Sequence, residues 1–482
     1  MKKQPKSIHI LIGILVFLVL RLILGRCTDM GITAAGASTL ALFIATIYLW
    51  ITYGTGWTSM LSISALAFTG IMPASTIMAN SFGNSTTVIC IGTLILCVAL
   101  EENGVTTLIS NWFITRKIVS KRPYVFLFMF LLANLVVCYF MEATAVMIIF
   151  LVLAKGVLDS LGYTTEDKFA KALYLGVLWI TCVGNGASPI GHPVVLLMIN
   201  SMAEMTGAPV SWVKYMMVGI PLSLVTLGLT ILIFKFVLRP DCTKYAAYDV
   251  MARRKELQKL SAKGKASLVV YVALIIVWLL PDFIGSILPQ VEAILDRVGA
   301  SIFSLLAVAI VCAIRIKGEP VLKYETAVKK ISWPTVFFIA CIFLYASAFN
   351  MESGGINVFL RNLVAPITSS LPASVLAAVF LCFVIVATNF FSNGVIGTIG
   401  ISVGVPALMA VSPVGYVTAY GVLVAALCNM GIATPGGSGF VALAQKDGYI
   451  TGGETLKYSM LLIVVMYIAV MLIFWPLAQA LF

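Results

Sequence analysis

The chain has 482 residues, of which 61% are hydrophobic types and only 10% are Asp, Glu, Lys or Arg. A soluble globular domain carries about 25% charged residues. The mean hydropathy is +1.06, and apolar stretches of about 20 residues, long enough to cross a bilayer, recur along the chain. These values exclude soluble enzymes, nucleic-acid-binding proteins and secreted modules. They predict an all-α polytopic membrane protein with about 11 transmembrane segments.

The cysteines and histidines predict no metal site. The ten cysteines are spread singly, mostly within apolar runs, and no Cys-x-x-Cys pair occurs. Such residues act as small apolar fillers in helices. The only histidines are His9 and His192, and no hydrolase motif or phosphate-binding P-loop is present. We therefore expect no cofactor, no enzymatic activity and no ATP-driven transport by this chain alone.

Basic residues gather in four clusters that hold 20 of the 31 lysines and arginines. Cytoplasmic loops of membrane proteins are enriched in basic residues. We therefore place the clusters in the cytoplasm, with the N-terminus inside and the C-terminus outside an inner cell membrane. The positive net charge is then an orientation signal rather than a nucleic-acid patch. The clusters lie at residues 2–6, 116–122, 239–265 and 315–330.

The predicted elements follow in chain order from an N-terminal anchor helix that carries Arg21. This helix lacks a small-residue cleavage signature, so we do not expect a cleaved signal peptide. Scaffold helices occupy residues 1–79, with spans near 8–25, 31–53 and 57–79. They are followed by a first repeat over 80–238, a cytoplasmic linker with an amphipathic surface helix over 239–265, linking helices over 266–331, and a second repeat over 332–482.

Two apolar stretches are long enough to span the bilayer, yet the charges place both ends of each on one side. Residues 123–155 have basic ends and a polar middle at Cys138–Thr144. Residues 371–411 have a polar middle at Asn389–Gly394. Non-helical backbone at membrane depth is tolerated only when it is buried in protein or lines a wet cavity. We expect two re-entrant helical hairpins, the first entering from inside and the second from outside.

An internal repeat relates the two halves of the chain, at offsets of about 250 residues. The charges indicate that the copies have inverted topologies. Inverted repeats with discontinuous helices are typical of secondary transporters, whose sites lie near the midplane. The aligned segments are Glu102-Asn-Gly with Glu352-Ser-Gly, Glu142-Ala-Thr with Ser392-Asn-Gly, and Gly186-Ala-Ser-Pro with Ile432-Ala-Thr-Pro, with Asn185 and Asn429 just before the last pair.

These motifs resemble those of the divalent anion/sodium symporter family of the ion-transporter superfamily. The family has two hairpins tipped by Ser-Asn-Thr, each followed by a broken helix with a Thr-Pro break. Here the second tip reads Ser392-Asn-Gly and the first reads Glu142-Ala-Thr. The breaks read Gly184-Asn-Gly-Ala-Ser-Pro-Ile-Gly and Asn429-Met-Gly-Ile-Ala-Thr-Pro-Gly. The resemblance implies a homodimer, an elevator-type movement, and contact of the tips with the carboxylates of a substrate.

The tips and breaks are the expected transport site. Unpaired carbonyls at a helix end suit sodium, and unpaired N–H groups suit an anion. Alternatively, the glycines and prolines only kink helices for packing. We expect the substrate at Glu142, Ala143, Thr144, Ser188, Pro189, Ser392, Asn393, Gly394, Thr434 and Pro435. We expect the coupling ion at Glu142, Asn185, Gly186, Asn393, Asn429 and Ala433, with sodium at Thr144, Gly184, Asn185, Ser392 and Asn429.

Glu142 permits three interpretations, because a carboxylate near the midplane is costly and usually signals function. It is a proton carrier, an anionic ligand of a sodium site, or a structural group that bonds to neighbouring backbone. His192 follows the first break and either gates protons, pairs with an anion or satisfies a helix end. Asn134 and Asn389 precede the tips and are expected to cap or bridge the hairpin arms.

The predicted function is secondary active transport of a small anion, with a di- or tricarboxylate as the substrate class. The coupling ion is sodium or, through Glu142, a proton. We expect the protein to be embedded in the lipid bilayer and to have no nucleic-acid partner. A cation/proton antiporter of the same superfamily is the alternative, favoured by Glu142 having no basic partner. The preserved Ser392-Asn393 pair favours the anion transporter.

Overall fold

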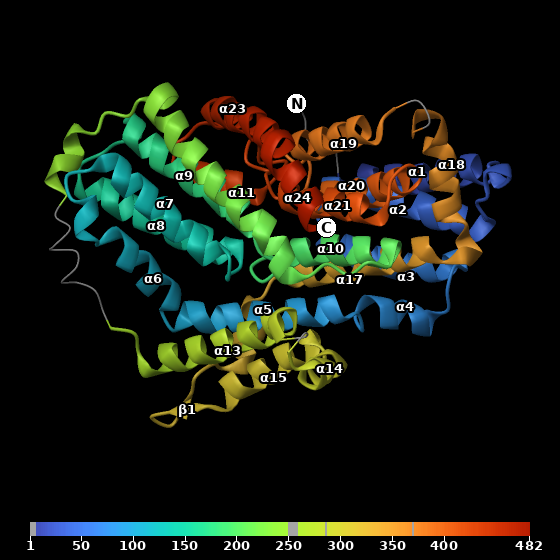
Figure 1. The fold of residues 1–482 in the computed structure, drawn as a ribbon, viewed down its shortest axis with the longest axis horizontal. Coiled ribbons are helices and arrows are strands. Elements are labelled where there is room, and N and C mark those ends of the chain that lie inside the picture. The colour runs from blue at the N-terminus through green and yellow to red at the C-terminus, as the bar shows by residue number, and fades with distance from the viewer. Residues whose placement is uncertain (1–5, 249–258, 285–286, 369–370) are drawn as a thin grey trace.

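The computed structural model of the protein describes residues 6–248, 259–284, 287–368 and 371–482. Most of this part of the chain is helical (Figure 1), which confirms the all-α prediction. The strands in the described residues are β1 (Arg315–Ile316) and β2 (Glu319–Pro320). They pair antiparallel, with Arg315 opposite Pro320 and Ile316 opposite Glu319, and form one small hairpin.

The first helices pack together, and α1 lies along α2 (Figure 1). The expected single span over 57–79 is wrong, because two helices separated by a turn occupy it. Gly70 adopts φ 76° in that turn, and Pro73 precedes the second helix and has no N–H to continue a helical ladder. The elements are α1 (Lys6–Leu24), η1 (Thr28–Met30), α2 (Ala34–Tyr53), α3 (Gly56–Leu66), η2 (Ala67–Thr69) and α4 (Ala74–Ser81).

The next seven helices contain the first hairpin and the first broken helix, as predicted. The hairpin arms are α7 and α8, and the second arm extends to Ser160 rather than 155. The broken helix consists of α9 and α10. The elements are α5 (Ser85–Glu102), α6 (Val105–Ile114), η3 (Lys117–Val119), α7 (Pro123–Cys138), α8 (Ala143–Ser160), α9 (Lys168–Asn185), α10 (Pro193–Thr206), α11 (Trp212–Ile233) and the π-helical η4 (Phe234–Leu238).

A peripheral layer follows along the lower edge of Figure 1, where α15 packs against α5. The surface helix expected in the linker falls mostly on residues 249–258, outside the described residues. The axes of α14 and α15 meet at 73°. The elements are η5 (Thr243–Ala247), α13 (Ala262–Ile284), α14 (Pro289–Val298), α15 (Ala300–Ala313) and α16 (Tyr324–Lys330).

The C-terminal elements repeat the order of those from α5 to η4. A long helix and a short helix precede a hairpin (α19, α20), a broken helix (α21, α22) and a long helix with a π-helical turn, which here continues into α24. The elements are α17 (Trp333–Asn350), η6 (Glu352–Gly354), α18 (Ile356–Thr368), α19 (Ala373–Ala387), α20 (Asn393–Met409), α21 (Val414–Leu427), α22 (Gly439–Gln445), α23 (Gly452–Ala469), η7 (Val470–Phe474) and α24 (Trp475–Leu481).

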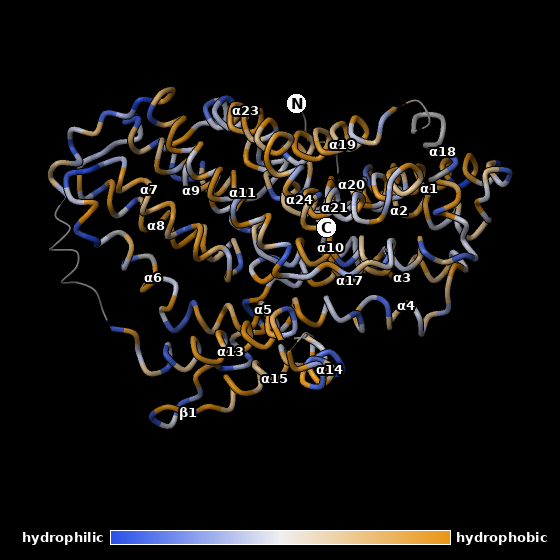
Figure 2. The backbone as a smooth tube through the Cα atoms, viewed as in Figure 1, coloured by the Kyte–Doolittle hydropathy of each residue, from blue (hydrophilic) through white to orange (hydrophobic). Residues whose placement is uncertain are grey.

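Among the described residues, seven helices are long and apolar enough to cross a membrane, or eight if α14 and α15 count as one bent span. Figure 2 shows apolar residues along all of these helices. The hairpin arm α7 and the half-helices α10 and α21 are apolar but shorter. They do not need to span the bilayer alone, because each continues through a break into another element.

The helices that lead into the breaks form the centre of the core. Residues 172–185 of α9 and residues 417–427 of α21 are all buried. A helix that is apolar on every side is packed on every side. Trp179 of α9 donates a hydrogen bond from Nε1 to the Ser459 hydroxyl of α23 at 2.8 Å. The half-helices therefore approach the breaks from a rigid interior.

A backbone contact joins the N-terminal helices to the second half of the chain. The Thr33 hydroxyl donates to the Ser353 carbonyl at 2.8 Å. The Gly354 carbonyl lies so close to Gly36 of α2 that a Cβ on Gly36 would be 1.9 Å from it. Only glycine allows this approach, so α2 is fixed against η6.

Candidate functional site

The first hairpin tip comprises residues 139–142, where α7 ends and α8 begins. Glu142 is the N-cap of α8. Its carboxylate accepts hydrogen bonds from the Thr144 N–H at 2.8 Å, the Thr144 hydroxyl at 2.9 Å and the Ala145 N–H at 3.4 Å. Negative charge is favourable at a helix N-terminus, where N–H groups have no helical partner. These contacts match the structural interpretation of Glu142.

Glu142→Ala is expected to lower the free energy of unfolding by about 1 kcal/mol, the usual cost of losing an N-cap acceptor. Glu142→Gln retains an oxygen that can accept from the same N–H groups, and we expect it to keep most of the stability. Thermal unfolding of the purified variants measures both effects. Equal destabilisation by the two substitutions would show that the charge, and not the cap, is what the fold requires.

The second hairpin tip comprises residues 388–392, and Ser392 is the N-cap of α20. Unlike Glu142, the Ser392 side chain makes no cap hydrogen bond, so its hydroxyl is available to another partner. The Thr388 hydroxyl lies 2.9 Å from Asn393 Oδ1 and 2.5 Å from the Cys428 carbonyl. The tip is thereby attached to the end of α21.

Gly394, the third residue of the second motif, faces α17 rather than an open space. A Cβ on Gly394 would lie 2.5 Å from Cε1 of Phe338. The Phe338 ring packs in turn against Trp50 of α2, with ring centroids 4.9 Å apart. The Phe338 ring, supported by Trp50, therefore fills the place that a larger third residue would take.

The second break runs from residue 428 to residue 438, between α21 and α22. Asn389 of the hairpin tip holds it in place. Its Oδ1 accepts hydrogen bonds from the N–H groups of Ile432 and Ala433, both at 2.9 Å. The Thr434 hydroxyl donates to the Asn389 carbonyl at 2.5 Å. Asn389 thus gives the Ala433 N–H its acceptor and shares the Ile432 N–H with the Met430 carbonyl, and it joins the hairpin to the break.

The first break runs from Gly186 to His192, between α9 and α10. The Tyr215 hydroxyl of α11 donates to the Gly186 carbonyl at 2.6 Å. Ser188 is buried, and its hydroxyl accepts from the Ile190 N–H at 3.1 Å. A Cβ on Gly191 would lie 2.3 Å from the Cys138 carbonyl. The first break therefore packs directly against the end of α7, just before the first tip.

The two breaks meet at Gly186. A Cβ on Gly186 would lie 2.6 Å from the Ala426 carbonyl and 3.2 Å from Cβ of Asn429, so only glycine permits the approach. The amide oxygens of Asn185 and Asn429 are buried there, and neither has a hydrogen-bond partner in the part of the chain that the structure describes. An unpartnered buried acceptor is costly, and amide and carbonyl oxygens are ligands for hard cations.

The predicted site residues differ in how far they are buried. Each tip packs against the break that follows it, and the breaks bring Asn185, Gly186 and Asn429 together. Thr144 and Pro435 are exposed, and Glu142, Ser392, Asn393 and Thr434 are half-buried. The other predicted residues are buried in the protein and are not open to a solute. They are Ala143, Gly184, Ser188, Pro189, Gly394 and Ala433.

Several contacts of the two hairpins were not predicted. Asn389 was expected to bridge the hairpin arms, but its Oδ1 binds the break instead. Asn134 pairs with Thr181 of α9 at 3.0 Å, so it joins the hairpin to the broken helix. Tyr271 of α13 donates to the Phe140 carbonyl at the first tip. The sequence feature that could have indicated the role of Asn389 is the polar Thr388-Asn389 pair within an apolar run.

His192 is the N-cap of α10 and makes no side-chain cap hydrogen bond. Its Nδ1 is buried without a partner among the described residues. The interpretation that this ring satisfies a helix end is therefore wrong.

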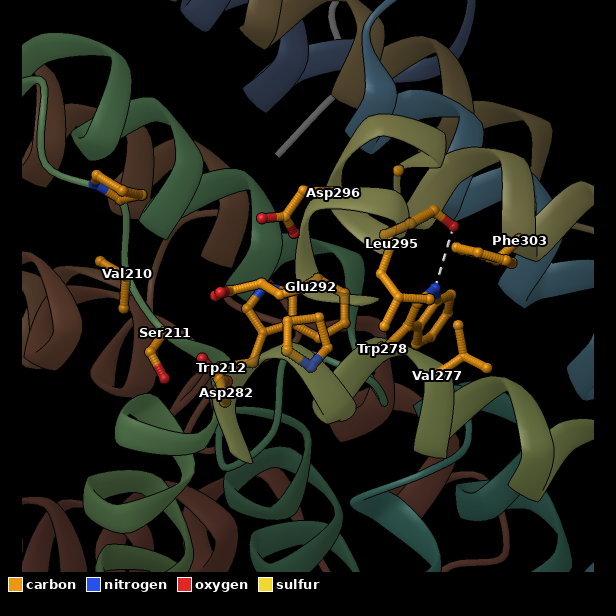
Figure 3. Close-up of a pocket in the computed structure, with 14 residues that line it drawn as sticks. Val210, Ser211, Trp212, Val277, Trp278, Asp282, Glu292, Leu295, Asp296 and Phe303 are labelled. Carbon is orange, nitrogen blue, oxygen red and sulfur yellow. Dashed lines mark hydrogen bonds between the residues drawn. The ribbon is translucent and has the colours of Figure 1, made fainter. Parts of the chain in front are cut away.

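A cavity of about 520 Å³ lies apart from the tips, between α11, α13, α14 and α15 (Figure 3). Trp212 and Trp278 line it with ring centroids 5.4 Å apart. Asp282, Glu292 and Asp296 also line it. Three carboxylates oppose the binding of an anion, so this cavity is not the site for one.

Comparisons with known proteins identify the family of this chain. Residues 5–481 match the family model described as the sodium:sulfate symporter transmembrane region. The sodium-dependent dicarboxylate transporter SdcS of Staphylococcus aureus is 23% identical over 346 residues. That match covers 69% of this chain and 66% of the relative, just under two thirds of its length.

The fold is also similar to that of a solved structure. The YdaH transporter of Alcanivorax borkumensis matches with a TM-score of 0.52 and 15% identity, over 82% of this chain and 86% of that one. The family model spans nearly the whole sequence, which confirms the resemblance to divalent anion/sodium symporters. It also confirms the expectation of a transporter rather than an enzyme. The chain therefore belongs to the sodium:sulfate symporter family.

Proposed function

We propose that this protein is a sodium-coupled transporter that moves a small di- or tricarboxylate across the membrane by alternating access. The observation that carries the proposal is the junction of the two helix breaks. At this junction Gly186 packs against Ala426 and Asn429, and the amide oxygens of Asn185 and Asn429 are buried without a partner among the described residues. The family and the named activity of the relative SdcS support sodium rather than a proton as the coupling ion. They also favour an anion transporter over the cation/proton antiporter.

The proposed ion sites lie at the two breaks. Asn185 and the Gly184 carbonyl, with Thr144 of the first tip, would provide oxygen ligands for one sodium ion. Asn429 and Ser392 would provide ligands for the other. Each set combines a buried amide oxygen with a hydroxyl of the neighbouring tip. Oxygen ligands of this kind suit a hard monovalent cation, because they supply partial negative charge without a buried net charge.

The proposed substrate site lies between the tips, on the sides that the structure leaves exposed or half-buried. Asn393, Thr434 and the N–H groups at the start of α20 would bind a carboxylate of the substrate. A helix N-terminus attracts an anion through its unpaired N–H groups and its dipole. The Ser392 hydroxyl makes no cap hydrogen bond, so it remains free to bind substrate or sodium.

We further propose the arrangement in the membrane that the charges and the resemblance imply. The segments 80–238 and 332–482 act as two repeats of opposite orientation, and 1–79 with 266–331 form the fixed scaffold. The hairpins move against that scaffold in an elevator-type step within a homodimer. Phe338 of α17 packs on Gly394 and on Trp50 of α2, so its contact with Trp50 lies where the second repeat meets the scaffold. The N-terminus is cytoplasmic and the C-terminus extracytoplasmic.

Ser392→Ala and Asn393→Ala are each expected to reduce sodium-driven uptake to background, because each removes a polar group of the second tip. The measurement is uptake of labelled succinate by proteoliposomes with an inward sodium gradient, with sulfate tested in parallel. Ser64→Ala is the control, since Ser64 is exposed on α3 and bonds only within its helix. Normal uptake by both tip variants would place the substrate elsewhere.

The same assay decides between the coupling ions. With sodium as the coupling ion, uptake follows the sodium gradient at constant pH, and Glu142→Gln leaves it largely unchanged. Uptake that requires a pH gradient, and that Glu142→Gln abolishes, would instead identify Glu142 as a proton carrier.

A further inference from the structure

A second cavity, of about 470 Å³, lies among the N-terminal helices, away from the tips and breaks. It is bounded by α1, α2, α3 and η2. Most of its lining is apolar, with residues such as Phe17, Leu42 and Leu49. Arg21 is the one charged residue among those that line it.

The polar groups in the wall are already satisfied by the protein. The hydroxyls of Ser38, Thr46, Thr58 and Thr69 each donate to a carbonyl of their own helix or turn. The Ser62 hydroxyl pairs with the Tyr345 hydroxyl at 2.6 Å. The wall therefore offers an occupant mainly apolar contact, because the protons of these hydroxyls are already donated within the protein. The charged donor in the lining is Arg21.

The shape of the cavity fits a hydrocarbon chain. It follows α1 from Ile10 to Arg21, which are about 16 Å apart along a helix. One leaflet of the apolar bilayer core is about 15 Å thick. Phe68 lines the cavity and is 92% exposed, and Leu22 on α1 is 70% exposed. The cavity thus opens on an apolar outer surface, where lipid tails are the solvent.

The charge at one end of the cavity selects among amphiphiles. Arg21 lies within one turn of the end of α1 and is exposed. Among the residues that the structure describes, no acidic side chain pairs with it. Guanidinium groups bind phosphate with two parallel hydrogen bonds. A lipid with net negative charge neutralises Arg21, whereas a zwitterionic lipid brings its own cation.

We propose that this cavity binds one anionic phospholipid, with an acyl chain along α1 and its phosphate on Arg21. The site is independent of the transport function proposed above. The lipid fills the space between α1, α2 and α3 and so stabilises the N-terminal scaffold, against which α17 packs.

Native mass spectrometry of the detergent-purified protein, titrated with phosphatidylglycerol or phosphatidylcholine, tests the proposal. We expect one phosphatidylglycerol to bind in preference to phosphatidylcholine. Arg21→Gln should weaken phosphatidylglycerol binding by about tenfold, the loss of one charge-assisted contact. Arg26→Gln is the matched control, because it removes the same charge next to the same helix from a residue that does not line the cavity.

A variant that fills the cavity tests the place of the acyl chain. Ala65→Leu puts a larger side chain into the lining and should weaken binding of both lipids, while Arg21→Lys should retain the phosphatidylglycerol preference. Equal binding of phosphatidylglycerol by the wild type and Arg21→Gln would overturn the proposal. So would a disulfide-linked dimer of Phe68→Cys, since a second copy of the chain would then cover the opening.

Discussion

Replacement of Asn389 with alanine is expected to abolish uptake and to destabilise the protein. The substitution leaves the Ala433 N–H buried without an acceptor and leaves the Ile432 N–H with only the Met430 carbonyl, at 3.0 Å. An unsatisfied buried donor costs about 1–3 kcal/mol, so we expect a loss of stability of about that size. The second break then has no fixed shape, and any ligand that depends on it is lost. Uptake by proteoliposomes and thermal unfolding measure the two effects.

Asn134→Ala is the matched control for this variant. Asn134 is as buried as Asn389 and lies in the first hairpin, but its side chain pairs with Thr181 rather than with a break. We expect it to lose stability while keeping sodium-dependent uptake at temperatures where it remains folded. If Asn389→Ala transports normally, the break does not need the hairpin tip to hold it.

Replacement of Asn185 or Asn429 with leucine is expected to remove the response of the protein to sodium. Leucine has a similar volume and no oxygen. In sodium-free buffer Asn185→Leu should be no less stable than the wild type, because it loses a buried oxygen that has no partner among the described residues. Asn429→Leu also loses the hydrogen bond from Nδ2 to the Ala425 carbonyl, so its stability without sodium is its own reference. A ligand at 100 times its Kd stabilises the native state by about 2.7 kcal/mol. We expect that gain in the wild type and its loss in each variant.

Thermal unfolding in sodium chloride against choline chloride provides this measurement without any transport assay. Asn357→Leu is a close control, since the Asn357 amide oxygen is also buried without a partner in the described residues, but it lies on α18. It should retain the full sodium response. If sodium still raises the unfolding temperature of both Asn185→Leu and Asn429→Leu, these oxygens are excluded as sodium ligands.

The hairpins and breaks could be predicted because their signal is local. Polar residues in the middle of an apolar run, and Pro189 or Pro435 after glycines, interrupt a helix wherever it packs. The break between α3 and α4 had the same kind of signal, in Gly70 and Pro73. It was missed because the surrounding residues are apolar enough to read as one span.

The partners of the polar residues could not be predicted, because they depend on tertiary contacts. Asn389 binds the backbone at residues 432 and 433, more than 40 positions away. No periodicity relates such positions. Nor does the sequence show that Gly394 meets Phe338, or that the Glu142 carboxylate accepts from the Thr144 N–H of its own helix.

The hydrogen bonds behind the second break connect the two halves of the chain. Ser459 donates to the Ile432 carbonyl at 2.9 Å and accepts from Trp179, which lies on the helix that ends at the first break. An ion that orders one break therefore reduces the entropy that remains to be lost at the other. Binding of the two ions would then be cooperative, with a Hill coefficient above one, although they share no ligand.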